Sequence, residues 1–183
     1  MNFIPLKLSG AYLIEHKLIE DHRGSFSRLF CKNELKKIGH TDDVVQISQS
    51  INPKPGTLRG LHYQKPPRAE IKIIKCISGA VFDVIVDLRR YSATFLQWCA
   101  VTLTKEDRKM IYVPKGFAHG FQTLERESHL IYFTTAFYSR SHEGALHYQD
   151  PLLSISWPLK ISTISERDEQ LPFITKRFTG LDV

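Results

Sequence analysis

The sequence predicts an all-β fold, a sandwich or barrel of short strands, on three observations. Short runs of apolar and β-branched residues recur along the chain, and Gly, Pro and Asn separate them. Hydrophobic residues make up 42% of the 183 residues and aromatic residues 11%, which is enough for a packed core. A chain of this length suits one well-packed domain over residues 1–183 better than two.

The strand-like runs are clearest in the middle of the chain, at Ile71 to Ile77, Ala80 to Leu88, Leu96 to Leu103, Met110 to Val113 and His129 to Phe137. One helix is expected from Lys32 to Ile38, because Gly39 follows at the position where a left-handed residue ends a helix. A second short helix would start at Ser165, whose hydroxyl can cap the backbone ahead of Glu166-Arg167-Asp168.

Charged residues share a face with apolar residues in two of these runs. Lys72 lies on the same face as Ile74 and Cys76, since successive side chains of a strand point to opposite sides. If this face is the interior, a lysine lies inside the barrel; the alternative is that its ammonium group extends to water, as is usual for lysine. Asp83 and Asp87 share a face in the second run, so a carboxylate is also expected inside.

Composition and charge exclude several classes of protein. The formal net charge is +6, but the basic residues are scattered and no helix-turn-helix or zinc-finger spacing occurs, so the charge favours a small anionic substrate over nucleic acid. No run approaches the roughly 20 apolar residues of a membrane span, and the first residues lack the features of a signal peptide. Cys31, Cys76 and Cys99 form no CxxC pair, which is typical of thiols in a reducing cytosol, and we expect a cytoplasmic protein.

The segment Arg59-Gly60-Leu61-His62 holds the first candidate site residues. A lone histidine in a strand is more often structural than catalytic, but Arg59 adds a bidentate cation suited to phosphate. On an ideal strand Arg59 and His62 would face opposite sides. Both can serve one site only if the strand bulges or bends, and Gly60 is the residue that permits this.

A second histidine lies in the motif Pro114-x-Gly116-x-x-His119, which resembles half of the cupin signature. Metal-binding cupins add a His-x-His pair and a Glu, whereas here His62 is followed by Tyr63 and Gln64. We therefore expect a cupin jelly-roll barrel with a few short peripheral helices and no catalytic metal. The alternative is a metal site of two histidines and one carboxylate, built from His62, His119 and a distant acid.

A longer series of motifs is similar to the dTDP-4-dehydrorhamnose 3,5-epimerase family in order and in approximate spacing. The motifs are Asp21 to Phe26, Gly56 to Gln64, Glu70 to Lys72, Asp83 to Arg89, Pro114 to Phe121, Asp150-Pro151, Ile155 to Pro158 and Ile164 to Asp168. The resemblance implies a cofactor-independent isomerase that acts on nucleotide-diphospho-4-keto-6-deoxy sugars and forms a homodimer. An ordered series of this kind is far more specific than any single motif.

The resemblance also implies the catalytic roles. His62 would be the base, partnered by Asp168, Lys72 would stabilise the enolate oxygen, and Tyr132 would return a proton from the opposite face of the ring. These residue types suit the chemistry, because a C–H next to a ketone is too weakly acidic for imidazole unless a fixed cation stabilises the enolate as it forms. Inversion also needs an acid on the other face.

Substrate-binding residues carry over less evenly. Five match family positions that bind the diphosphate, sugar or nucleotide: Arg23, Gln46, Arg59, His119 and Glu143. Three positions depart from the residues common in the family: Arg28 replaces a Glu, Ser48 replaces an Asn, and Arg167 replaces a Lys. These departures lie on the ligand-binding side of the motif set, so a nucleotide or sugar other than dTDP-4-keto-6-deoxyglucose stays open.

The predicted reaction is inversion at C3, C5 or both of a 4-keto-6-deoxy sugar nucleotide, in the synthesis of a deoxysugar for a polysaccharide or a glycosylated metabolite. One alternative is a mono-epimerase on another nucleotide sugar, such as a CDP-linked dideoxy-hexulose or a 4-keto-heptose. Another is a non-catalytic cupin that binds a sugar nucleotide, although binding alone needs no base and acid on opposite faces.

Overall fold

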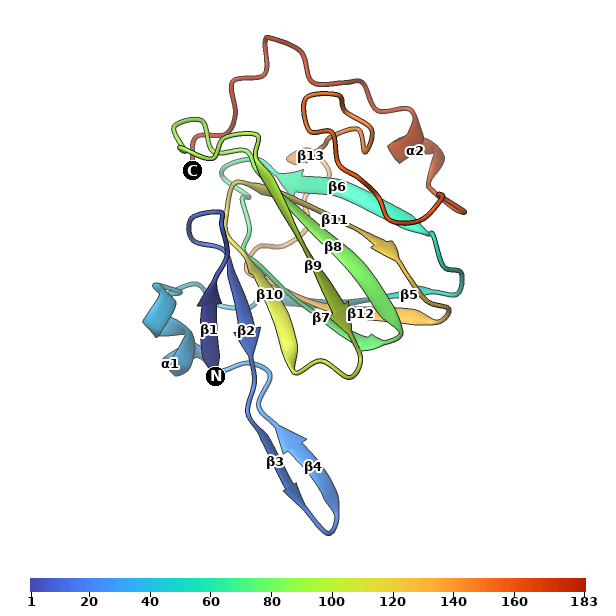
Figure 1. The fold of residues 1–183 in the computed structure, drawn as a ribbon. Helices are drawn as coiled ribbons and strands as arrows, with labels where there is room; N and C mark the ends of the chain where they lie inside the picture. The colour runs from blue at the N-terminus through green and yellow to red at the C-terminus, as the bar shows by residue number, and fades with distance from the viewer.

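The computed structural model describes residues 1–183 and consists mainly of two antiparallel sheets that face each other (Figure 1). The six-stranded sheet has the order β1 (Asn2–Pro5), β2 (Tyr12–Glu15), β10 (Lys109–Val113), β7 (Lys72–Ser78), β12 (Ser128–Thr134) and β5 (Gln46–Asn52). The five-stranded sheet has the order β13 (Glu143–Ala145), β6 (Leu58–Gln64), β11 (Phe117–Thr123), β8 (Ala80–Asp87) and β9 (Trp98–Thr104).

Three smaller elements lie outside the two sheets. Strands β3 (Leu18–Asp21) and β4 (Gly24–Ser27) form a hairpin that projects away from the barrel (Figure 1). Helix α1 (Lys32–Leu35) continues as a 3₁₀ turn over Lys36–Ile38. Helix α2 (Glu166–Glu169) lies beside β6 in the C-terminal part of the chain. None of the helices is long and apolar enough to cross a membrane.

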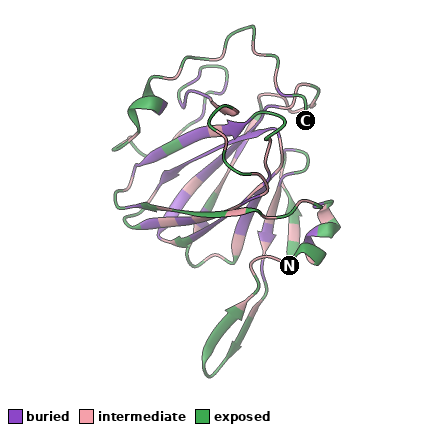
Figure 2. Ribbon diagram, turned by 180° about the vertical axis from the view of Figure 1, so that it is seen from behind, coloured by how far each residue is buried: buried purple, intermediate pink, exposed green.

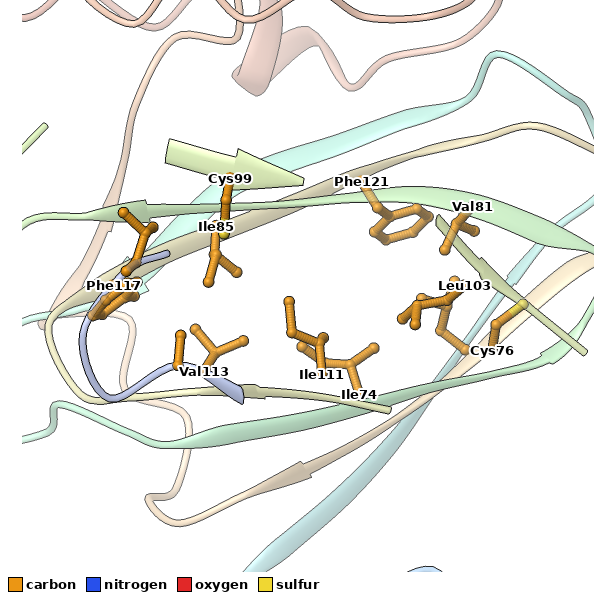
Figure 3. Packing of buried hydrophobic residues seen from close by; sticks show 13 residues of the cluster. Ile74, Cys76, Val81, Ile85, Cys99, Leu103, Ile111, Val113, Phe117 and Phe121 are labelled. Carbon is orange, nitrogen blue, oxygen red and sulfur yellow. The ribbon is translucent and has the colours of Figure 1, made fainter. Parts of the chain in front are cut away.

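The core lies between the two sheets, where alternate residues of each strand point inward. Ile74 and Cys76 of β7 meet Ile85 and Phe121 of the opposite sheet, and all four are buried (Figure 3). Figure 2 shows that buried residues concentrate on the strands of the barrel, whereas the projecting hairpin is mostly exposed. Burial of this apolar face is the main driving force for the fold.

The structure confirms the all-β prediction and its elements. The five predicted runs correspond to β7, β8, β9, β10 and β12, and their ends differ by at most three residues. The largest difference is at the end of β12, which stops at Thr134, the partner of Lys72 at the start of β7. One more backbone hydrogen bond follows, from the Thr135 N–H to the Ile71 carbonyl at 3.2 Å. Both predicted helices are present, with Gly39 left-handed at φ 78.

The interior positions of charged residues are also confirmed, because Asp83 and Asp87 are fully buried. Asp87 lies away from the cavity described below and accepts hydrogen bonds from Arg89, Ser92 and Thr94. Cys76 and Cys99 are buried free thiols. That residues 1–183 form a single domain stays a prediction.

Candidate active site

A cavity of about 580 Å³ contains all four residues that the sequence predicts to be catalytic. His62 and its partner helix α2 lie on the side of the five-stranded sheet, whereas Lys72 and Tyr132 come from the six-stranded sheet. The remaining lining residues are Thr57, Leu58, Arg59, His119, Phe121, Thr163, Ile164, Ser165 and Arg167.

His62 and Asp168 form a hydrogen-bonded pair at one wall of the cavity, with 2.8 Å between Nε2 and Oδ1. A carboxylate only accepts hydrogen bonds, so Nε2 carries the proton and Nδ1 is left free to accept one. Burial alone would raise the pKa of Asp168, but the hydrogen bond and charge of His62 and the Gly60 backbone N–H outweigh it and lower that pKa. Asp168 is therefore ionised at neutral pH and accepts the hydrogen bond of His62 as a carboxylate.

Local contacts bring Asp168 to His62 across more than 100 residues of sequence. The Asp168 backbone N–H donates to the Ser165 hydroxyl at 3.1 Å, which is the helix cap that the sequence predicts. The preceding segment is bound to β6, because the Leu58 N–H donates to the Thr163 carbonyl at 2.8 Å. The short helix α2 is thus held against the strand that carries the histidine.

A bulge in β6 lets Arg59 and His62 line the same cavity. His62 pairs with His119 and Arg59 pairs with Phe121, so three steps along β6 oppose two steps along β11. The inserted position includes Gly60, which has φ 128, and a Cβ there would collide with the Gly120 backbone. The bulge prediction is confirmed, and only glycine fits without a shift of the neighbouring strand.

Lys72 lies inside the barrel, as strand alternation predicts. Its side chain is 14% exposed, its ammonium group lies 3.3 Å from Glu70, and it donates to the His62 carbonyl at 3.4 Å. The alternative, an ammonium group extended to water, is not observed. Glu70 belongs to one of the family motifs, but the sequence assigns it no role. The structure shows that it pairs with Lys72.

Tyr132 points into the cavity from β12, and its hydroxyl lies 3.1 Å from Ser50 Oγ on the adjacent strand. Burial raises the pKa of Tyr132 well above its usual value, and the hydrogen bond with Ser50 acts in the opposite direction. The phenol is therefore protonated at neutral pH, as an acid must be. His62 and Tyr132 come from opposite sheets of the barrel.

His119 forms a second histidine–carboxylate pair in the cavity, with 2.8 Å between its Nε2 and Asp83 Oδ2. It lies directly opposite His62 in the register of the five-stranded sheet, and its ring meets that of Tyr132 edge-on at 6.1 Å. Sequence alternation predicts that Asp83 lies inside but does not predict its contact with His119.

Five predicted binding residues do not line the cavity of this chain. Arg23 and Arg28 belong to the projecting hairpin region, where they pair with Asp21 and Glu34. The others lie nearer to the cavity but outside its lining: Gln46, Ser48 and Glu143.

Gln46 and Ser48 lie on β5, where Ser48 is the register partner of Tyr132. Glu143 accepts a hydrogen bond at 2.9 Å from Arg167, which lines the cavity. Sequence reasoning missed Ser50 and Asn52, which follow Gln46 and Ser48 at every second position; this alternation of polar residues is the signal that could have found them. No group of three or more His, Cys, Asp and Glu side chains is arranged to hold a metal ion.

Comparisons with known proteins agree with this architecture. The model of the dTDP-4-dehydrorhamnose 3,5-epimerase family matches residues 5–176. An epimerase of this name from Shigella flexneri is 37% identical over 169 residues, which is 92% of this chain and 93% of that protein. The crystal structure of the Bacillus anthracis enzyme, with TDP and PPi bound, is 39% identical with a TM-score of 0.91, over 94% of this chain and 99% of that one.

A more specialised relative has the same fold. ChmJ from Streptomyces bikiniensis, described as a 3'-monoepimerase in complex with dTDP-quinovose, is 33% identical with a TM-score of 0.85, over 92% of this chain and 86% of that one. The family match covers nearly the whole chain, and the barrel is the cupin-type jelly roll of these epimerase structures. The chain therefore belongs to the dTDP-4-dehydrorhamnose 3,5-epimerase family and is an isomerase of deoxysugar biosynthesis.

Proposed function

We propose that this enzyme inverts the configuration at C3, C5 or both of a nucleotide-diphospho-4-keto-6-deoxy sugar by removing a proton next to the C4 ketone. One observation carries the proposal: a His62–Asp168 pair and the protonated phenol of Tyr132 come from opposite sheets of one cavity that also holds the Lys72 ammonium group. Inversion requires this arrangement, because a proton removed from one face must be replaced from the other.

The reaction starts when Nδ1 of His62 takes the proton from the carbon next to the ketone. The electron pair of the broken C–H bond moves onto the ketone oxygen, where the Lys72 cation stabilises the enolate. Fixed charges of this kind contribute roughly 100- to 1000-fold to the rate of enolate-like transition states. Tyr132 then gives its proton to the opposite face of the carbon, and exchange with water restores the protonation states of His62 and Tyr132.

Substrate binding would rest on the cations at the cavity. Arg59 and Arg167 are suited to the diphosphate, since guanidinium groups bind phosphate oxygens in a bidentate manner. His119 would bind a sugar hydroxyl, held in place by Asp83. The TDP and PPi bound by the Bacillus anthracis relative favour a dTDP-linked substrate, although Ser48 and Arg28 leave other nucleotides to be tested.

We also propose a homodimer, formed through the outer face of the six-stranded sheet. Ile47 and Ile51 of β5 lie on this face and are exposed, and such apolar patches favour association. The hairpin that carries Arg23, whose side chain is 79% exposed, would then reach the cavity of the second copy. This arrangement accounts for predicted binding residues that lie far from the cavity of their own chain.

A mono-epimerase is the second candidate function. It is favoured by the similarity to ChmJ, a 3'-monoepimerase, and by Ser48 in the position of the family's Asn beside Tyr132. A change next to the acid alters which carbon lies within its reach, so one centre would be inverted instead of two.

The test is proton NMR in heavy water with 4-keto sugar nucleotides linked to dTDP, CDP and GDP. Deuterium that enters C3 or C5 of one compound identifies the nucleotide and the carbons together. His62→Ala should abolish exchange, whereas His142→Ala, which changes a loop histidine outside the cavity, should not. Near-normal turnover by the His62→Ala protein contradicts the assignment. Binding of a compound without exchange favours the non-catalytic alternative.

A further inference from the structure

A row of hydrogen-bonded side chains connects Arg59 to Tyr132, and only these two end members line the cavity. Arg59 Nε donates to Asn52 Oδ1 at 2.8 Å, and Asn52 Nδ2 donates to Ser50 Oγ at 3.3 Å. Ser50 Oγ lies 3.1 Å from the Tyr132 hydroxyl. Asn52 and Ser50 belong to β5 and point inward, and neither has a part in the mechanism described above.

The orientation of the Asn52 amide is determined by its neighbours. Arg59 Nε can only donate a hydrogen bond, so the group that faces it must be the amide oxygen. The Ser128 carbonyl can only accept, and it lies 2.9 Å from Asn52 Nδ2. Asn52 is 1% exposed and cannot exchange these partners for water. The amide therefore presents its second N–H to Ser50.

This orientation favours one direction for the remaining hydrogen bond, between Ser50 and Tyr132. Ser50 Oγ accepts from Asn52, and its own hydroxyl proton is left for one acceptor. The only other side-chain oxygen within hydrogen-bonding distance of Ser50 is that of Tyr132. If Ser50 donates to this oxygen, the phenolic proton of Tyr132 has no partner along the wall and is free to point into the cavity.

We infer that Ser50 and Asn52 are positioning residues for the acid step, which direct the Tyr132 proton toward the substrate and stabilise the phenolate left after the proton is given. This inference rests on the proposed function. The direction of donation suits both stages of the step, since an O–H···O⁻ hydrogen bond is roughly twice as strong as a neutral one. Burial opposes formation of the phenolate by raising the pKa of Tyr132, and the Ser50 hydrogen bond counteracts that effect.

The test compares two variants of nearly equal shape at one position. Ser50→Thr keeps the hydroxyl, whereas Ser50→Val replaces it with a methyl group, and both suit a strand. Each protein is given the active sugar nucleotide in heavy water, and deuterium exchange and inversion are followed separately. Without a positioned acid, the enolate is deuterated again by His62 on its original face, which gives exchange without inversion.

We expect Ser50→Val to lower the ratio of inversion to exchange by about tenfold, the upper range for loss of one hydrogen bond, with KM changed by less than about twofold. Ser50→Thr should restore the ratio to within about threefold of the native protein. Thr102→Val, which removes an exposed strand hydroxyl on β9, should change neither quantity. If Ser50→Val does not fold, Ser50→Ala replaces it with the same expected loss.

The outcomes separate this inference from the proposed function. If the native protein exchanges deuterium and the Val and Thr variants show the same ratio, the positioning role is overturned and the proposed function stands. An equal loss of exchange and inversion in Ser50→Val also overturns it, because a merely structural defect would affect both. If the native protein catalyses deuterium exchange in none of the sugar nucleotides tested, the proposed function fails and this inference fails with it.

Discussion

Replacing Asp168 with Asn removes the charge of the catalytic pair while keeping the shape of the side chain. The carboxylate accepts two hydrogen bonds, from His62 Nε2 at 2.8 Å and from the Gly60 N–H at 3.4 Å. The amide of Asn has a single oxygen, so it can accept from either His62 Nε2 or the Gly60 N–H but not from both in the present geometry. The cap on α2 is unaffected, because it involves the Asp168 backbone N–H and Ser165.

Either orientation of the new amide harms the base. If its oxygen faces Gly60, its N–H₂ faces His62 Nε2 and stabilises the tautomer in which Nδ1 already carries the proton. If its oxygen faces His62, the tautomer is correct, but the negative charge that stabilises the imidazolium form is lost. The attraction between unit charges at about 4 Å is about 4 kcal/mol near a protein surface. Since 1.36 kcal/mol corresponds to a factor of ten, we expect exchange to slow by about 100- to 1000-fold.

The assay is the initial rate of deuterium incorporation in heavy water at saturating substrate, measured by proton NMR. Glu169→Gln is the matched control, because it removes one negative charge from the same helix at an exposed position with no ion pair. Thermal unfolding of each variant shows whether the fold is retained. Exchange by Asp168→Asn within about threefold of the native rate, or an equal loss in Glu169→Gln, would refute the role given to this carboxylate.

Three further predictions concern the cation, the core and acid stability. Lys72→Gln keeps a hydrogen-bond donor but removes the charge, so deuterium exchange should slow by about 100-fold or more; an unchanged rate contradicts enolate stabilisation. Leu103→Ala, at a fully buried position between the sheets, should lower the free energy of unfolding in urea by about 2–5 kcal/mol, whereas Leu152→Ala at a 61% exposed position should cost less than about 0.5 kcal/mol. Because the pKa of Asp168 is lowered in the folded state, its ionisation stabilises the protein above the unfolded pKa of about 3.9, and this contribution is lost as pH falls further. The difference in unfolding free energy between the native protein and Asp168→Asn should therefore shrink below about pH 4 in acid unfolding curves. A difference that stays constant as pH falls through this range contradicts the idea that ionised Asp168 stabilises the fold.

The sequence by itself determined the features that depend on short-range geometry. Side chains alternate along a strand regardless of its neighbours, so Lys72 shares a face with Ile74, and Asp83 shares one with Val81 and Ile85. The cap at Ser165 and the left-handed Gly39 are likewise properties of a few consecutive residues. The need for a bulge at Gly60 follows from the requirement that two residues three apart share a site.

Only the tertiary structure decided which side chains meet. Ser50 and Tyr132 are 82 residues apart, and they touch because β5 pairs with β12 at the edge of the six-stranded sheet. The pairing of Asp83 with His119 likewise depends on β8 lying beside β11. Strand order is set by burial of the whole apolar face in one closed core, a collective property of every strand at once. No local pattern of residues contains strand order, and for this reason the sequence does not predict contacts such as Ser50 with Tyr132 or Asp83 with His119.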